Sequence, residues 1–314
     1  MAMVRAPAVA GTFYPADPDR LAAEVVRHLE NGRQALAARG GAPGVSPANV
    51  LGQPTDGAPA RAPSPGGAGS VAAPRQSSAA PAKTPGQAPV KALIAPHAGY
   101  VYSGPTAGCA YAALGGSYER VVLMGPCHHV GTPFAALPGA DWFRTPLGDV
   151  AVWQEGAQRV AELSEVITSS HIHEREHSLE VHLPFIQTAL GPDIPVLPLA
   201  VGWSDPGAVA AVIEAVWGGP ETLFVFSSDL SHYLPYDEAV SSDQATVKQI
   251  LAGRLPLAGD QACGAYPVNG LLEVARRQPL RGELIDYRNS GDTAGDKSAV
   301  VGYAALTFRQ EAPS

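Results

Sequence analysis

Residues 120–130 read RVVLMGPCHHV, and this stretch indicates both the fold and the place of a functional site. Its apolar residues, 121–124, form a short run that a Gly-Pro pair ends, a pattern typical of a strand buried on both faces of a sheet. Cys127, His128 and His129 follow directly. Because ligands bind outside the carboxyl ends of strands in open α/β sheets, these side chains are candidate site residues.

Three further apolar runs end in the same way. They are VKALIA (90–95), IPVLPLAV (194–201) and LFVFS (223–227). His97 follows the first run, whereas Asp229 and His232 follow the last. The pattern predicts an α/β fold in which several strand ends direct His and Asp side chains at one rim of the sheet.

Composition and charge limit the classes of protein to consider. The chain has 314 residues, of which 46% are hydrophobic and 16% charged, so it can bury a sizeable core. Its net charge of -8, without any basic run, argues against a nucleic-acid partner. Three cysteines cannot all pair and lack metal-knuckle spacing, which favours a reducing compartment. With no signal-peptide core and no apolar run of membrane-spanning length, we expect a cytoplasmic protein with no membrane contact.

One stretch, residues 40–89, differs sharply in composition from the rest. It contains ten of the chain's 30 prolines, is rich in Gly, Ala and Ser, and has no aromatic residue. Such a sequence cannot bury enough apolar surface to offset its ordering entropy. We expect residues 1–314 to form a single domain that a disordered insertion at 40–89 interrupts. A polyproline II ligand at 63–65 is the alternative, but the aromatic and basic flanks are lacking.

The cluster HIHEREHSLEVHLPF, residues 171–185, contains a pattern found in zinc proteases. His173 to His177 fits H-E-x-x-H and also the inverted H-x-x-E-H form. Either form needs both histidines on one face of a well-formed helix. The segment before His173 reads as a strand or loop, and Pro184 interrupts any helix that follows, so we do not favour a protease site.

Several other polar groups have two interpretations. His177, Glu180 and His182 either line the same cleft or form a buried structural network. Asp229 and His232 have the spacing of an acid-base pair, in which the carboxylate fixes the imidazole tautomer. Alternatively, Asp229 caps the following helix.

Two candidate ligands carry weak signals when each is taken alone. His97 lies in a glycine-punctuated loop and could be an ordinary loop histidine. Cys263 stands beside a glycine at an expected helix start, where the helix dipole favours a thiolate. Its alternative is an apolar core cysteine.

Seven short motifs, taken in order, resemble the Memo family, whose bacterial members are also called AmmeMemoRadiSam system protein B. They are AGTFYP (10–15), APHAGYVY (95–102), GPCHHV (125–130), RTPL (144–147), EHSLEVHLP (176–184), SSDLSH (227–232) and CGAYP (263–267). The resemblance spans the chain outside residues 40–89. It implies a three-layer α/β/α sandwich with a central mixed, largely parallel sheet, related to class III extradiol dioxygenases that use non-haem iron.

The resemblance also implies a set of site residues. His97 and His128 match the two metal histidines of those dioxygenases, and Cys263 replaces their carboxylate ligand. His232 matches the acid-base histidine, with Asp229 beside it. The side chains expected to line the cleft are Phe13, Tyr102, His129, His177, Glu180 and His182, where Phe13 replaces the Trp of some members.

The expected function follows from this ligand set. A thiolate ligand softens the site and favours Cu(I), zinc or a differently tuned iron, so we expect an iron or copper ion, with zinc as an alternative. Three functions remain open: redox or oxygenase chemistry on an unknown substrate, a metal carrier without turnover, and a peptide-binding interaction module. The family name suggests radical SAM enzymes and AMMECR1-like proteins as partners.

Overall fold

The computed structural model describes residues 2–40 and 88–310. Its helices are α1 Pro18–Gly40, α2 Tyr100–Ala112, α3 Gln154–Ala161, α4 Ser170–Glu174, the 3-10 helix Glu180–His182, α5 Leu183–Leu190, α6 Pro206–Ala215, α7 Tyr236–Leu251, α8 Ala265–Ala275 and α9 Ser290–Thr293. The insertion predicted at 40–89 lies almost wholly outside the described residues. Its disorder, and the single-domain boundaries drawn around it, stay predictions.

A mixed sheet forms the middle of the molecule. Its strands are, in spatial order, β10 His232–Leu234, β12 Val300–Gln310, β2 Val90–Ala95, β9 Thr222–Ser227, β3 Arg120–Pro126, β8 Val196–Val201, β4 Ala135–Leu137 and β7 Val166–Thr168, with β11 Leu280–Asn289 also paired to β12. The four central strands β2, β9, β3 and β8 are parallel, whereas β12 pairs with its neighbours in antiparallel fashion. The expected α/β fold with a mixed sheet is confirmed.

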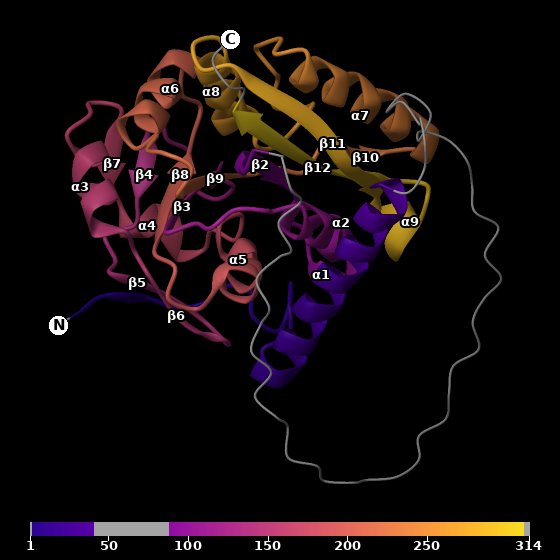
Figure 1. Cartoon of the computed structure of the whole chain (residues 1–314), viewed down its shortest axis with the longest axis horizontal. Coiled ribbons are helices and arrows are strands. Elements are labelled where there is room, and N and C mark those ends of the chain that lie inside the picture. Colours follow the sequence, from indigo (N-terminus) through magenta and orange to yellow (C-terminus); the bar gives the residue numbers. More distant parts are fainter. Residues whose placement is uncertain (1, 41–87, 311–314) are drawn as a thin grey trace, which may run out of the picture.

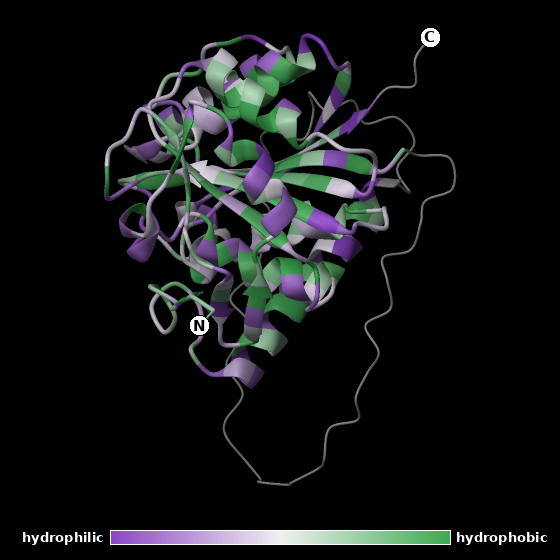
Figure 2. Ribbon diagram, turned by 90° about the vertical axis from the view of Figure 1, so that its left-hand side faces the viewer, coloured by the Kyte–Doolittle hydropathy of each residue, from purple (hydrophilic) through white to green (hydrophobic). Residues whose placement is uncertain are grey.

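Helices cover both faces of this sheet. Side chains along the central strands alternate between two apolar clusters: Val121 and Leu123 belong to one, and Val122 and Met124 to the other. The first cluster packs on α1, α2 and α5, and the second on α3, α6, α7 and α8 (Figure 1). In Figure 2 the largely apolar strands lie between helices of mixed polarity. Within the described ranges, none of the helices combines the length and the apolar character needed to cross a membrane.

Local structure follows the sequence at some points and departs from it at others. The Asp17 carboxylate accepts a hydrogen bond from the Arg20 N–H at 2.9 Å and caps α1, as its position before Pro18 predicts. Strand β5 Trp142–Thr145, which was not predicted from the sequence, forms a hairpin with β6 Gly148–Ala151. β5 also pairs with the N-terminal strand β1 Val4–Arg5, which makes a small second sheet.

Candidate metal centre

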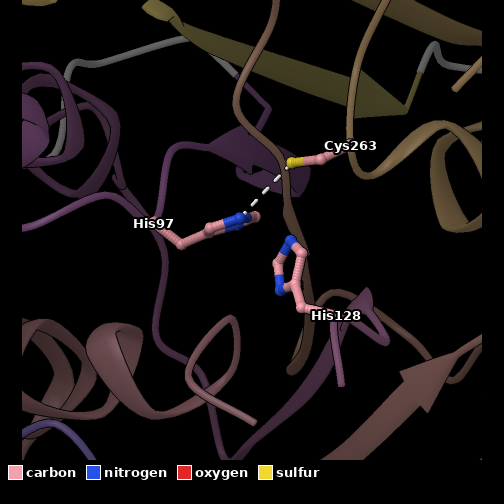
Figure 3. Close-up of side chains that lie close together, drawn as sticks. All are labelled: His97, His128 and Cys263. Atoms are coloured by element: carbon pink, nitrogen blue, oxygen red, sulfur yellow. Dashed lines mark hydrogen bonds between the residues drawn. The ribbon is translucent and has the colours of Figure 1, made fainter. Parts of the chain in front are cut away.

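Three predicted ligands meet at the carboxyl ends of the central strands. His97 follows β2, His128 follows β3, and Cys263 precedes α8. Their ligand atoms all lie within 4.8 Å of one another, and Figure 3 shows the side chains converging from separate segments. The Cys263 Sγ lies 3.3 Å from His97 Nε2. His97 is buried and His128 is exposed, so the cluster is open to solvent on the His128 side.

Cys263 reaches the cluster because its loop packs tightly on the end of β9. A Cβ atom on Gly264 would lie 2.4 Å from the Ser227 carbonyl oxygen, so only glycine allows this approach. The Asp229 N–H donates to the Cys263 sulfur at 3.2 Å. Burial, and next the Asp229 carboxylate, raise the pKa of the Cys263 thiol, which is opposite to the shift expected from the helix start. A bound cation would reverse this preference, since a coordinating thiol is deprotonated.

The two histidines are each held through Nδ1. His97 Nδ1 lies 2.6 Å from Ser227 Oγ, and His128 Nδ1 lies 2.9 Å from Glu176 Oε1. Burial and the neighbouring imidazoles lower the pKa of His97 well below its ordinary value, which keeps the ring neutral. Metal-bound histidines usually donate the N–H that does not face the metal to a carboxylate or other acceptor. The arrangement therefore leaves both Nε2 atoms for an ion.

Glu176 supports the centre without being free to act as a ligand. Its carboxylate accepts hydrogen bonds from the His128 ring and from three backbone N–H groups, those of His128, His177 and Ser178, at 2.6–3.0 Å. Burial opposes the charge, but the His128 and Ser178 donors outweigh it and lower the pKa of Glu176 to about 2. Although Glu176 and His177 also lie near His128, the cluster containing Cys263 is the better metal site because the Glu176 carboxylate already accepts four hydrogen bonds.

Asp229 and His232 both lie at this rim, but Asp229 contacts His97 and not His232. The Asp229 carboxylate accepts the His97 backbone N–H at 2.8 Å, and its other oxygen lies 4.0 Å from His97 Nε2. Burial raises the pKa of Asp229 to about 7. In the described part of the chain no hydrogen bond joins Asp229 to His232. His232 begins β10, and burial lowers the pKa of its partly buried ring.

Of the residues expected to line the cleft, His177 lies closest to the centre. Its ring stacks on His128 with centroids 4.7 Å apart and lies 5.7 Å from the His97 ring. The centroid of the Phe13 ring lies 4.7 Å from that of His177, and the centroid of His129 lies 6.1 Å from it. Tyr102, on α2, is partly exposed.

Glu180 and His182 take part instead in buried structural contacts, which was the alternative interpretation of these residues. Glu180 is fully buried and binds the N-terminal segment, including an ion pair with Arg5. His182 is buried against Tyr111, whose hydroxyl lies 3.0 Å from His182 Nδ1.

The zinc-protease pattern does not form a metal site. Helix α4 ends at Glu174, so His173 and His177 do not share a helix. The buried His173 ring donates from Nε2 to the Ala136 carbonyl at 2.8 Å, and burial lowers its pKa to about 4.

Two residues that bear on the centre were not singled out from the sequence, namely Glu176 and Ser227. Both lie inside motifs that were recognised, EHSLEVHLP and SSDLSH. The available signal was therefore the motif itself, because neither residue has a distinctive spacing from the ligand it contacts.

The donor set fits a transition-metal ion. Two imidazoles and one thiol are presented from three segments, with no carboxylate among them. This combination suits Cu(I), zinc or iron better than magnesium or calcium. Three protein ligands leave coordination positions open, as catalytic sites require.

Comparisons with known proteins identify the family of the chain. A family model described as Memo-like protein matches residues 75–307. A MEMO1 family protein of Ignicoccus hospitalis is 33% identical over 98% of this chain and 99% of its own length. One from Methanopyrus kandleri is 33% identical over 98% of this chain and its full length, and one from Methanococcoides burtonii is 37% identical over 69% of this chain and 85% of its own. These matches confirm the resemblance: the chain belongs to the Memo family.

Proposed function

We propose that this protein binds one iron or copper ion through His97, His128 and Cys263 and carries out redox or oxygenase chemistry on a small substrate. The observation that carries the proposal is the convergence of two Nε2 atoms and one sulfur within 4.8 Å at the rim of the parallel strands. Each histidine is oriented by a hydrogen bond from its other nitrogen.

The surrounding groups favour catalysis over simple storage of an ion. When bound, the ion would supply a redox-active Lewis acid with open coordination positions. Asp229 is a buried carboxyl group with one oxygen 4.0 Å from His97 Nε2, so a group that can exchange protons stands beside the proposed ion. Solvent reaches the centre on the side of His128, so a substrate can approach from there.

The metal assignment is tested by elemental analysis of protein purified without oxygen. We expect close to one iron or copper ion per chain, and we expect the double variant His97→Ala with His128→Ala to lose it. His173→Ala is the matched control, because it removes a buried histidine that bonds only a backbone carbonyl through its ring. Loss of the metal in His173→Ala, with retention in the double variant, would refute the site.

A metal carrier without turnover is the second candidate, and one observation favours it. The soft Cys263 ligand lies among the three candidate donors, where the resemblance implies a carboxylate in dioxygenases, and a thiolate is itself open to oxidation. Oxygen and a panel of catechols added to the iron-loaded protein separate the two candidates. Turnover that His232→Ala abolishes would establish an enzyme. Turnover only after Cys263→Glu would show that the thiolate prevents it and would favour the carrier.

A further inference from the structure

The Ser227 hydroxyl lies between two imidazole rings behind the metal centre. Its Oγ is 2.6 Å from His97 Nδ1 and 3.0 Å from His182 Nε2. It also lies 2.6 Å from the Ser178 carbonyl oxygen. Ser227, Ser178 and His182 are all buried, so these contacts are made away from bulk water.

The directions of these hydrogen bonds follow from one group that can only accept. A carbonyl oxygen has no proton, so the Ser227 hydroxyl must donate to Ser178. The hydroxyl has one proton and two lone pairs, so both lone pairs are left for the imidazoles. His97 must therefore carry its proton on Nδ1, and His182 must carry its proton on Nε2.

The same reasoning extends one residue further from the centre. With its proton on Nε2, His182 presents a bare Nδ1, which lies 3.0 Å from the Tyr111 hydroxyl. The phenol then donates to that nitrogen. Tyr111 is itself buried and stacks on Phe185, with centroids 5.3 Å apart. Tyr111, His182 and Ser227 form a chain in which every donor meets an acceptor, and we call it the Tyr111–His182–Ser227 relay.

We propose that this relay is a positioning device that fixes the tautomer of His97 and so presents a bare Nε2 to the metal. The proposal rests on the metal site proposed above. The other tautomer would place a proton on the nitrogen that faces Cys263, 3.3 Å away, where the ion would have to bind. It would also require Ser227 to turn its proton to His97 and leave the buried Ser178 carbonyl without a hydrogen-bond donor, which is unfavourable in the interior.

His128 also carries its proton on Nδ1, but a carboxylate holds it there instead of a hydroxyl. Its Nδ1–H donates to the Glu176 carboxylate, a partner that accepts and never donates when ionised. His97 has no carboxylate at its Nδ1, and a hydroxyl can both donate and accept. Because Ser227 donates its single proton to the Ser178 carbonyl, its hydroxyl acts as an acceptor toward His97, and Tyr111 completes the chain by donating to His182. Because His97 Nδ1 meets a hydroxyl and not a carboxylate, its tautomer depends on the partners of that hydroxyl.

The tautomer can be read without any metal. Nitrogen-15 NMR of the histidine rings distinguishes protonated from bare nitrogens, and the protein would be prepared with a chelator. We expect His97 to show Nδ1–H and bare Nε2 in the natural sequence, and a mixture of both tautomers in Ser227→Ala. Tyr111→Phe keeps the stacked ring and removes only the hydroxyl, so we expect a smaller change in the same direction.

Metal affinity gives the second readout. Titration with Cu(I) or Fe(II) under anaerobic conditions should show affinity about 10- to 100-fold lower in Ser227→Ala, the range expected when a metal ligand loses its supporting partner. Ser204→Ala is the matched control, since its buried hydroxyl also donates to a backbone carbonyl, that of Pro133, but contacts no imidazole. We expect it to leave affinity and tautomer unchanged.

The two readouts separate failure of this inference from failure of the metal site. If the natural sequence bound neither ion, the metal site would be wrong, and the relay's control of the tautomer would still be decided by the NMR result. A proton on His97 Nε2 in the natural sequence would overturn the inference. So would a single unchanged tautomer with full affinity in Ser227→Ala. If Ser227→Ala did not fold, Tyr111→Phe would decide in its place, by the same spectrum and the same titration.

Discussion

Glu176 and Glu180 lie four residues apart, and both are buried carboxylates surrounded by donors, yet they organise different parts of the molecule. Glu176 accepts from the His128 ring and from three backbone N–H groups. Glu180 accepts from the N-terminal segment: the backbone N–H groups of Ala8 and Val9 at 2.7 and 3.0 Å, the Tyr14 hydroxyl at 2.5 Å, and the Arg5 guanidinium.

The difference lies in the charge of the partners. Glu180 neutralises a buried arginine, so neither charge can be removed alone without leaving the other unpaired in the interior. The donors to Glu176 are three uncharged backbone N–H groups and the imidazole of His128. The other nitrogen of that imidazole faces the metal centre. Glu180 should therefore contribute mainly to stability, and Glu176 mainly to the properties of the centre.

The largest effect expected is on folding. Glu180→Ala leaves the Arg5 charge buried and unpaired and should lower the free energy of unfolding by about 3–5 kcal/mol. Denaturant unfolding measures it. Asp149→Ala is the matched control, because it breaks an Arg-carboxylate pair of good geometry, 2.7 Å between Arg144 Nε and Asp149 Oδ1, that is largely exposed and should cost less than about 1 kcal/mol. Equal losses in the two variants would contradict the stabilising role of Glu180.

A second variant tests the other carboxylate. Glu176→Gln keeps the shape of the side chain but replaces one acceptor oxygen with a donor amide, so His128 is held less firmly. We expect metal affinity about 10- to 100-fold lower, measured by anaerobic titration, with a smaller loss of stability than in Glu180→Ala. Metal affinity equally reduced in a folded Glu180→Gln protein would show instead that the two carboxylates act as one unit.

The sequence predicted the middle of the fold better than its edges. Strands such as β3 and β9 are continuous apolar runs because both of their faces are covered. Strand β11, LRGELIDYRN, was not predicted, because it pairs only with β12 and most of its residues are exposed or partly exposed. The hairpin of β5 and β6 was not predicted because its strands are short and Pro146 and Gly148, which are typical of turns, lie between or within them.

At the site, the sequence located the ligands but not the groups that hold them. His97 and His128 could be found because each follows a strand end, and strand ends meet at one rim. Glu176 contacts His128 across 48 positions and Ser227 contacts His97 across 130, and no spacing rule connects them. Glu180 was expected in the cleft, but its partner Arg5 lies 175 residues away, in a segment that gave no sign of a buried charge.

A third effect, small at any pH near neutrality, concerns the buried His173 and appears as a dependence of stability on pH. Burial lowers the pKa of His173 from 6.5 to about 4. Between these values the unfolded chain takes up a proton that the folded protein excludes, so stability falls as the pH falls. The contribution of this one group is about 1.4 kcal/mol per pH unit. His173→Asn cannot take up that proton, so its free energy of unfolding should fall less steeply between pH 6.5 and 4, as guanidinium unfolding at several pH values would show. His171→Asn, which replaces an exposed histidine two residues earlier, is the control and should keep the slope of the natural sequence. An unchanged slope in His173→Asn would mean that the ring is protonated in the fold, in which case its partner could not be the Ala136 carbonyl alone.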